Sequence, residues 1–313
     1  MCVEQFKHPV YTNKYCAKKY KCGTAENTVC IFNCKLSSQC HQFVDYELTD
    51  EHRQYVLDIH NFYRNLVASG YETRGGHSKA SNMMVLNYER DHEEVIHCWI
   101  RRCTYETDKC RSIASSVHNG QNMFRVERHA WWNDRFENGS VLIHRSITEW
   151  YEEVEHTNAK MVDSWSAKHN AQNVSQLLWA NTVAVGCGYG KTAFTDEEDE
   201  SNMISWHFFC NYNVGGNRKG EPMYLRGEPV TACPENTTAG TEYTSLCGEL
   251  EIVSSHRQPM MLFVDGKEYK HEPANKKNSQ LSVRRQHGSH GVSSADLVIC
   301  NVIACSLSLI NLF

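Results

Sequence analysis

The sequence lacks the features that mark several classes of protein. Basic residues are not in excess, with 32 Lys and Arg against 37 Asp and Glu, so we expect no nucleic-acid partner. The spacing Cys-x-x-Cys, from which most cysteine-based zinc sites are built, is absent. The opening residues, MCVEQFKHPVYTNKYC, contain no apolar run. A secretory signal is therefore not visible, and we expect it to lie upstream.

Cysteine, by contrast, is present in unusual number. Fifteen cysteines without zinc spacing predict a disulfide framework, which forms in oxidising compartments. Sequons for N-glycosylation begin at Asn138, Asn173 and Asn236. Together these features predict an extracellular protein, either secreted or attached to the outer cell surface. Two interpretations of Asn173 stay open, since it is either partly buried and unmodified or carries a glycan.

Changes of composition divide the chain into four segments. Residues 1–44 form a cysteine-rich N-terminal arm, and residues 45–230 mix helix and strand patterns in one domain. Residues 231–296 form a C-terminal extension that ends in a polar stalk without regular structure. Residues 297–313 form an apolar tail that matches a GPI-attachment signal. A short membrane anchor and a tail without a membrane role are the alternatives.

Hydrophobic periodicity places the elements of the central segment. Thr49 is a candidate N-cap, an apolar helical face runs from Val56 to Val67, and Gly70 is suited to end that helix. Further helices are predicted over residues 83–99 and 141–155, and buried strands over residues 174–180, 184–189 and 205–212.

Two pairs of cysteines follow from this placement. Cys187 and Cys210 lie in two of the predicted strands, and neighbouring strands bring such residues within bridging distance. Cys233 and Cys247 are close enough in the chain to close a small loop. The other connections do not follow from spacing alone.

Six short segments together resemble one family. They are HNFYRNLVASG, YETRG, DKCR, GQN, WYEE and CNYNVGGN, which begin at residues 60, 71, 108, 120, 150 and 210. In this order they resemble the CAP superfamily of cysteine-rich secretory proteins, antigen 5 and pathogenesis-related 1 proteins, and most of all its insect venom antigen 5 branch. The resemblance implies an α/β (α+β) fold, namely a disulfide-rich three-layer α-β-α sandwich.

The resemblance also implies a disulfide pairing. The implied pairs are Cys187–Cys210, Cys22–Cys110, Cys40–Cys103 and Cys16–Cys30. Cys34 and Cys98 are then left over, and we predict that they form an additional pair.

Many members of this family gather two histidines and two acidic residues in a cavity that holds a divalent metal. The positions that match those four residues here are Thr107, Gln121, Glu153 and Asn173. Only Glu153 keeps a strong ligand, and zinc prefers nitrogen and sulfur donors to neutral oxygens. We therefore expect no metal, no cofactor and no catalytic residue at these positions. Three other histidines are considered as substitute ligands, namely His156, His169 and His207.

The resemblance therefore favours a function in binding. The expected partner is a small apolar ligand, such as a lipid or sterol, or a cell-surface receptor. Trp99, Trp150 and Tyr151 either line an apolar groove for such a ligand or pack in the core. A metal-dependent hydrolase and a GPI-anchored adhesion module, attached to the membrane through the tail, are the alternative functions.

Overall fold

The structure is a computed structural model, and it describes only part of the chain. The described residues are 13–113, 118–131, 135–166, 169–196, 198, 200–257, 259–264, 266–271 and 282–284. The chain divides into a large unit, residues 1–258 with 273–279, and a small unit, residues 259–272 with 280–313. Three cysteines (Cys2, Cys300, Cys305) and the predicted tail at 297–313 lie outside the described residues.

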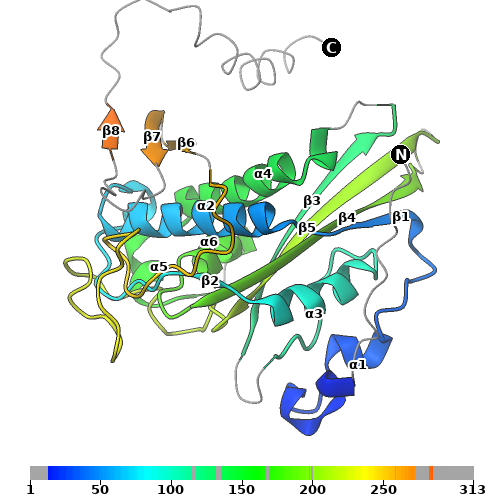
Figure 1. Cartoon of the computed structure of the whole chain (residues 1–313), viewed down its shortest axis with the longest axis horizontal. Helices are drawn as coiled ribbons and strands as arrows, with labels where there is room; N and C mark the ends of the chain where they lie inside the picture. The colour runs from blue at the N-terminus through cyan, green and yellow to red at the C-terminus, as the bar shows by residue number, and fades with distance from the viewer. Residues whose placement is uncertain are drawn as a thin grey trace, which may run out of the picture. The chain divides into compact units, whose positions relative to one another are not determined.

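A five-stranded sheet forms the middle of the large unit (Figure 1). Its main path has the order β1-β4-β5-β3, and β2 pairs with β4 in parallel. The other pairs are antiparallel. The strands are β1 (His41–Tyr46), β2 (Asn87–Tyr88), β3 (Gly120–His129), β4 (Ala184–Thr195) and β5 (Asn202–Asn213).

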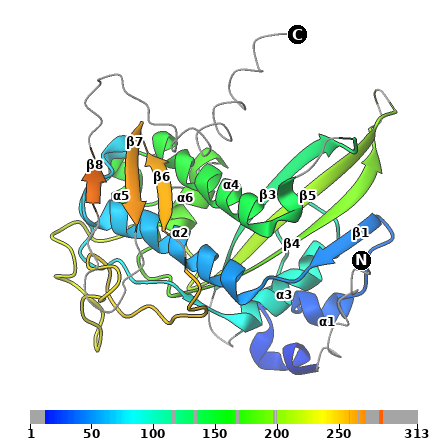
Figure 2. The ribbon, with the colours of Figure 1, turned by 45° about the horizontal axis from the view of Figure 1, so that its top comes forward.

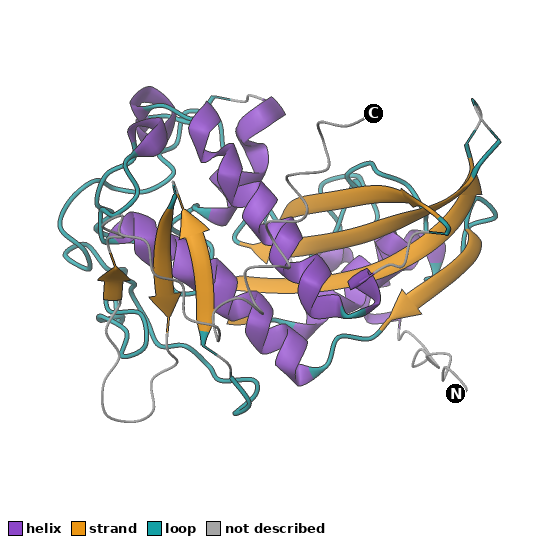
Figure 3. Ribbon diagram, turned by 90° about the horizontal axis from the view of Figure 1, so that it is seen from above, coloured by secondary structure: helices purple, strands orange, loops and turns teal. Residues whose placement is uncertain are grey.

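Helices cover both faces of this sheet, so the predicted three-layer α-β-α sandwich is confirmed. The helix α3 lies on one face, while α2, α4 and α6 lie on the other (Figures 1 and 2). From above, long helices pass in front of the strands (Figure 3). The α-helices are α1 (Thr28–Phe32), α2 (Asp50–Ala68), α3 (Arg90–Ile100), α4 (Gly139–Glu152), α5 (Ala159–Asp163) and α6 (Gln172–Leu177). Short 3-10 helices are η1 (Asn13–Cys16), η2 (Lys18–Tyr20), η3 (Arg74–Gly76), η4 (Arg135–Glu137), η5 (Glu153–His156) and η6 (His169–Ala171).

The ends of α2 follow the sequence prediction. Thr49 and His52 form a capping box, in which each side chain bonds the other residue's backbone N–H. Gly70 follows the helix with φ of +82°, a conformation that favours glycine.

None of the helices among the described residues is long and apolar enough to cross a membrane.

The core fills the space on both sides of the sheet. On the α3 side, Phe209 of β5 packs with Ile96 and Ile100 of α3. On the opposite side, the ring of Phe208 stacks on Trp150 of α4, with centroids 5.6 Å apart. This alternation along β5 matches a strand that is buried on both faces.

The structure pairs twelve cysteines as the sequence analysis predicted. The pairs have Cα–Cα distances of 4.1–5.5 Å, within or close to the usual range for disulfides. They are Cys16–Cys30, Cys22–Cys110, Cys34–Cys98, Cys40–Cys103, Cys187–Cys210 and Cys233–Cys247.

Two predicted elements differ in the structure. Residues 174–180 were predicted as a strand, but residues up to Leu177 belong to the helix α6. Residues 83–99 were predicted as one helix, but the helix α3 begins only at Arg90. The residues before it are extended because Asn61 holds the backbone N–H and C=O of Leu86.

The C-terminal extension contains more structure than predicted. Residues 249–257, which we call the strap, run along α2 and are held to it by side-chain hydrogen bonds.

In the small unit, an antiparallel sheet of order β6-β7-β8 occupies part of the predicted stalk. Its strands are β6 (Met260–Val264), β7 (Lys267–His271) and β8 (Ser282–Arg284).

Candidate functional site

Glu153 and Asn173, two of the four predicted cavity positions, are in direct contact. Glu153 lies at the C-terminal end of α4, and Asn173 lies in the first turn of α6. The side-chain amide of Asn173 donates to Glu153 Oε1 at 2.6 Å. Glu153 Oε2 accepts the backbone N–H groups of Asn173, at 2.8 Å, and of Val174, at 3.1 Å. The carboxylate therefore caps the exposed N–H groups at the start of α6.

Gln121 belongs to a second hydrogen-bonded group. Its Nε2 donates to Asp108 Oδ1 at 3.2 Å and to Asn211 Oδ1 at 3.0 Å. Asp108 also accepts hydrogen bonds from Thr28 and from Arg111. These hydrogen bonds hold the Gln121 side chain on the α3 side of the sheet, where Asn211 lies beside it on β5.

Strand β3 connects the group around Gln121 with the pair of Glu153 and Asn173. Asn122, which follows Gln121, points to the other face of the sheet and donates from Nδ2 to the carbonyl oxygen of Asn173 at 3.0 Å. Thr107, the fourth position, is exposed in the loop after α3. The structure thus joins Glu153 to Asn173 directly and connects Gln121 to Asp108, the neighbour of Thr107.

The electrostatics of Glu153 do not favour a metal ion. Burial raises the pKa of Glu153, while the hydrogen bonds from Asn173 and Val174 oppose that rise. Three N–H donors point at its oxygens, and their positive ends would repel a cation at the same place. Within the described ranges, no group of three or more His, Cys, Asp or Glu residues is arranged to hold a metal ion. The residues at the four positions do not fit a divalent metal.

The histidines considered as substitute ligands differ in their surroundings. His207 is buried on β5, where its Nε2 lies 2.9 Å from Ser205 Oγ, and burial lowers its pKa to about 4. His156 is exposed at the end of η5, and its charge lowers the pKa of Glu153. The side chain of His169 lies outside the described residues.

Two of the aromatic residues considered for a groove belong to the core. Trp150 is 2% exposed, and Tyr151 is fully buried against Tyr63 with ring centroids 3.8 Å apart. Tyr151 also donates a hydrogen bond to Glu72 Oε2 at 2.7 Å. Trp99 is only half-buried. Core packing therefore explains Trp150 and Tyr151, whereas Trp99 is available at the surface.

The three sequon asparagines also differ in exposure. Asn138, the N-cap of α4, and Asn236 are exposed, so both are accessible to a glycan. Asn173 is half-buried, and its side-chain nitrogen is bonded to Glu153. The structure is in keeping with the interpretation in which Asn173 is unmodified.

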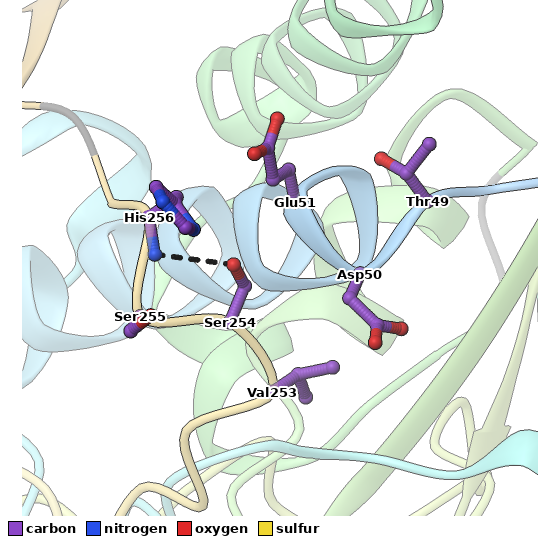
Figure 4. A pocket seen from close by; sticks show the side chains of 7 residues that line it. All are labelled: Thr49, Asp50, Glu51, Val253, Ser254, Ser255 and His256. Carbon is purple, nitrogen blue, oxygen red and sulfur yellow. Dashed lines mark hydrogen bonds between the residues drawn. The ribbon is translucent and has the colours of Figure 1, made fainter.

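A hollow of about 510 Å³ lies at a different place, between the start of α2 and the strap (Figure 4). Asp50 and Glu51 point away from each other on the helix, and Ser254 Oγ accepts a hydrogen bond from the backbone N–H of His256 at 3.2 Å. Asp50 is already paired with two arginines of the large unit. The polar groups that line the hollow do not converge on a common point, whereas a catalytic site needs such an arrangement.

Sequence reasoning missed the strand that positions Gln121. Phe124 and Val126 alternate with Arg125 and Glu127, which is the period of a half-buried strand, and this signal predicts β3. The strap is the other missed feature. No periodicity marks it, because its contacts with α2 are isolated hydrogen bonds. The backbone N–H groups of Val253 and Ser254 donate to Gln54, and the Arg257 side chain donates to Asp58.

Comparisons with known proteins show the family and the fold of the chain. Residues 57–212 match the model of the cysteine-rich secretory protein family, CAP. Venom allergen 5 of Microctonus hyperodae is 30% identical over 203 residues, which cover 64% of this chain and 82% of the relative. Venom allergen 5.01 of Dolichovespula maculata is 31% identical over 220 residues, which cover 69% and 90% of the two chains. The structure of BmVAL-1 has a TM-score of 0.50 at 19% identity and covers 66% of this chain and 97% of its own, which shows a shared fold.

Proposed function

Because the chain belongs to the cysteine-rich secretory protein (CAP) family, we propose that it is an extracellular protein that acts by binding, without a metal ion and without catalysis. Its partner is a small apolar ligand, such as a lipid or sterol, or a cell-surface receptor.

The observation that carries this proposal is the bonding of Glu153. It is the only carboxylate among the four cavity positions, and its two oxygens accept three N–H hydrogen bonds at the start of α6. A zinc ion would have to displace these donors to reach a single strong ligand. No general base accompanies Ser175 in this segment either, since Asn173 stands where the family has a histidine.

The extracellular location is supported by the disulfides and by the sequons. Six bridges in one chain are typical of oxidising compartments and rare in the cytosol. Asn138 and Asn236 are both exposed, as an attached glycan requires. The anchored adhesion module depends on residues 297–313, which lie outside the described residues, and stays a prediction from the sequence.

Measuring the zinc content of the purified full chain tests the proposal. After incubation with zinc and dialysis, we expect far less than one equivalent by plasma mass spectrometry. A zinc-binding protein of known stoichiometry, carried through the same incubation and dialysis, is the positive control for the assay. One tightly held equivalent in the wild type that Glu153→Ala abolishes would refute the proposal.

A further inference from the structure

A group of aromatic and arginine residues forms a surface on the α3 side of the large unit. We call it the aromatic–arginine surface, and it consists of Phe32, Trp99, Tyr105, Arg102 and Arg125. Phe32 ends α1, and Trp99 and Arg102 lie at the end of α3. Tyr105 follows in the next loop, and Arg125 lies on β3. Figure 2 shows α1 and α3 side by side in this part of the molecule.

The members of this surface are in contact with one another. The rings of Phe32 and Trp99 have centroids 6.1 Å apart. Trp99 Nε1 donates to the carbonyl oxygen of Glu106 at 2.7 Å, which ties the indole to the loop that carries Tyr105. Trp99 also packs against the core around Phe209, and the Tyr105 ring lies 6.2 Å from Phe209. The aromatic rings are therefore connected, with the buried ring of Phe209 as the link between Trp99 and Tyr105.

The patch is open to solvent. Tyr105 is 43% exposed, and Phe32 and Trp99 are half-buried. Two aliphatic side chains of the N-terminal arm, Ile31 and Leu36, are 50% and 48% exposed close to Phe32 in the chain. A cluster of partly exposed aromatic residues is unusual on a surface with no partner, because aromatic side chains are normally buried.

Disulfides hold this surface in place. Trp99 is adjacent to Cys98 and Tyr105 lies two residues after Cys103, while Phe32 lies two residues before Cys34. The bridges Cys34–Cys98 and Cys40–Cys103 join these segments. The aromatic side chains therefore sit on a backbone that is already rigid. Binding to a preorganised surface costs little conformational entropy.

Two arginines lie over the rings of this surface. The guanidinium of Arg102 lies 4.3 Å from the centre of the Phe32 ring, and that of Arg125 lies 4.8 Å from the centre of the Tyr105 ring. Arg102 donates to the carbonyl oxygen of Lys35, a neutral acceptor that does not cancel its charge. Arg125 also lies 3.5 Å from the exposed carboxylate of Glu127, an exposed ion pair of the kind that contributes little energy.

We propose that the aromatic–arginine surface binds an acidic segment of a partner protein, in which carboxylates lie beside apolar side chains. Trp, Tyr and Arg are the residues most enriched at the centres of protein interfaces. A guanidinium that lies flat on a ring still presents its edge, which matches a carboxylate bidentately. The proposal rests on the proposed binding function and names the surface and the partner.

The charges at the margin favour a peptide over a lipid bilayer. Glu106 and Glu127 are exposed beside the patch, and Glu127 lies 3.5 Å from Arg125. A flat anionic membrane would meet both carboxylates at once and be repelled, whereas a narrow peptide can bind Arg102 and displace the exposed, weakly held Glu127 from Arg125.

Selection of peptides tests the proposal. A random phage-displayed peptide library is panned on the full-length protein and, separately, on Arg102→Glu/Arg125→Glu. We expect the wild type to enrich peptides with Asp or Glu next to apolar residues, and the charge-reversed variant to lose them. Arg145→Glu is the matched control, because Arg145 also stacks on aromatic rings, Phe124 and Phe136, but lies on α4. It should select the same peptides as the wild type.

Three results would overturn the proposal: basic peptides in place of acidic ones, no enrichment above the charge-reversed variant, or equal loss with Arg145→Glu. Vesicles rich in phosphatidylserine are the second probe. Binding of the vesicles that depends on Arg102 and Arg125, without acidic peptides, would assign the surface to membranes. The zinc measurement is independent of both probes, so failure here leaves the metal-independent function standing.

Discussion

Asn173 donates two hydrogen bonds to Glu153, one from its side-chain amide and one from its backbone N–H. The resemblance places Asn173 where many members of the family have a histidine that shares a cavity with a glutamate. Here the asparagine and the start of α6 use the carboxylate as a helix cap. The same two positions therefore serve helix stability.

The first prediction is that this pair stabilises α6. Asn173→Ala removes one hydrogen bond to a charged acceptor, and we expect it to lower the free energy of unfolding by about 1–3 kcal/mol. Gln172→Ala is the control, because Gln172 is the exposed neighbour on the same helix, and it should change stability by about 0.5 kcal/mol or less. Urea denaturation of both variants checks this, and equal stabilities would show that the side-chain hydrogen bond of Asn173 contributes nothing.

The same pair explains why α6 was predicted as a strand. Leu177, Leu178, Trp179 and Ala180 form a short apolar run, and such a run does not distinguish a buried strand from a buried helix. The residue that decides the outcome is Glu153, which lies 20 positions earlier in the chain. A cap supplied from another element leaves no local pattern.

The second prediction concerns pH dependence at His97. Burial lowers the pKa of His97, but the charge and hydrogen bond of Asp45 outweigh burial, so the pKa is raised. The ring lies 2.9 Å from Asp45, which also accepts a hydrogen bond from Arg101 at 3.0 Å. A raised pKa means that the folded state holds the proton more tightly. This contribution to stability is full below about pH 6.5 and is lost as the pH rises through the folded pKa.

Comparison with His97→Gln isolates the effect. Unfolding free energies are measured by urea titration at several pH values between mildly acidic and mildly alkaline. The wild type should lose stability relative to the variant as the pH rises, because the variant has no proton to release. A parallel course of the two curves would exclude a stabilising charged His97.

The third prediction contrasts two buried histidines. Burial lowers the pKa of His60 to about 4 and that of His92 to about 3. His60 bonds the carbonyl oxygen of Val56 and the hydroxyl of Tyr212, at 2.8 and 2.9 Å. Neither ring nitrogen of His92 has a hydrogen-bond partner within the part of the chain that the structure describes.

Leucine substitutions should therefore have opposite effects. At neutral pH, His60→Leu breaks two hydrogen bonds and should cost about 2 kcal/mol, whereas His92→Leu should be neutral or stabilising. Both groups have lowered pKa values, so each costs stability as the pH falls below about 6.5. His92→Leu should accordingly reduce the loss of stability in acid. Thermal unfolding at neutral and acid pH measures this, and a large cost of His92→Leu at neutral pH would contradict it.

The fold could be predicted from the sequence more fully than the contacts of the four cavity positions. The helix that ends before Gly70 and the strands around Cys187 and Cys210 have local signals in caps and apolar runs. The bonding of Gln121 and Glu153 was not predictable from sequence. Each side chain selects its partners from other elements, and that choice depends on the packed arrangement of the sheet and helices.

The last prediction concerns the strap, which lies beyond the family-matched residues 57–212. Arg257 pairs with Asp58 of α2 and with Glu242, and all three side chains are nearly buried. Arg257→Ala removes the ion pair that the strap gives to the buried carboxylate of Asp58, so we expect a loss of about 3 kcal/mol or more. Arg90→Ala is the control, because Arg90 and Asp50 form an exposed pair and its loss should cost about 1 kcal/mol or less. Urea denaturation compares the two variants. Similar small costs for the two variants would show that the strap contributes little to stability. The expected larger cost of Arg257→Ala would show that the strap is part of the folded domain.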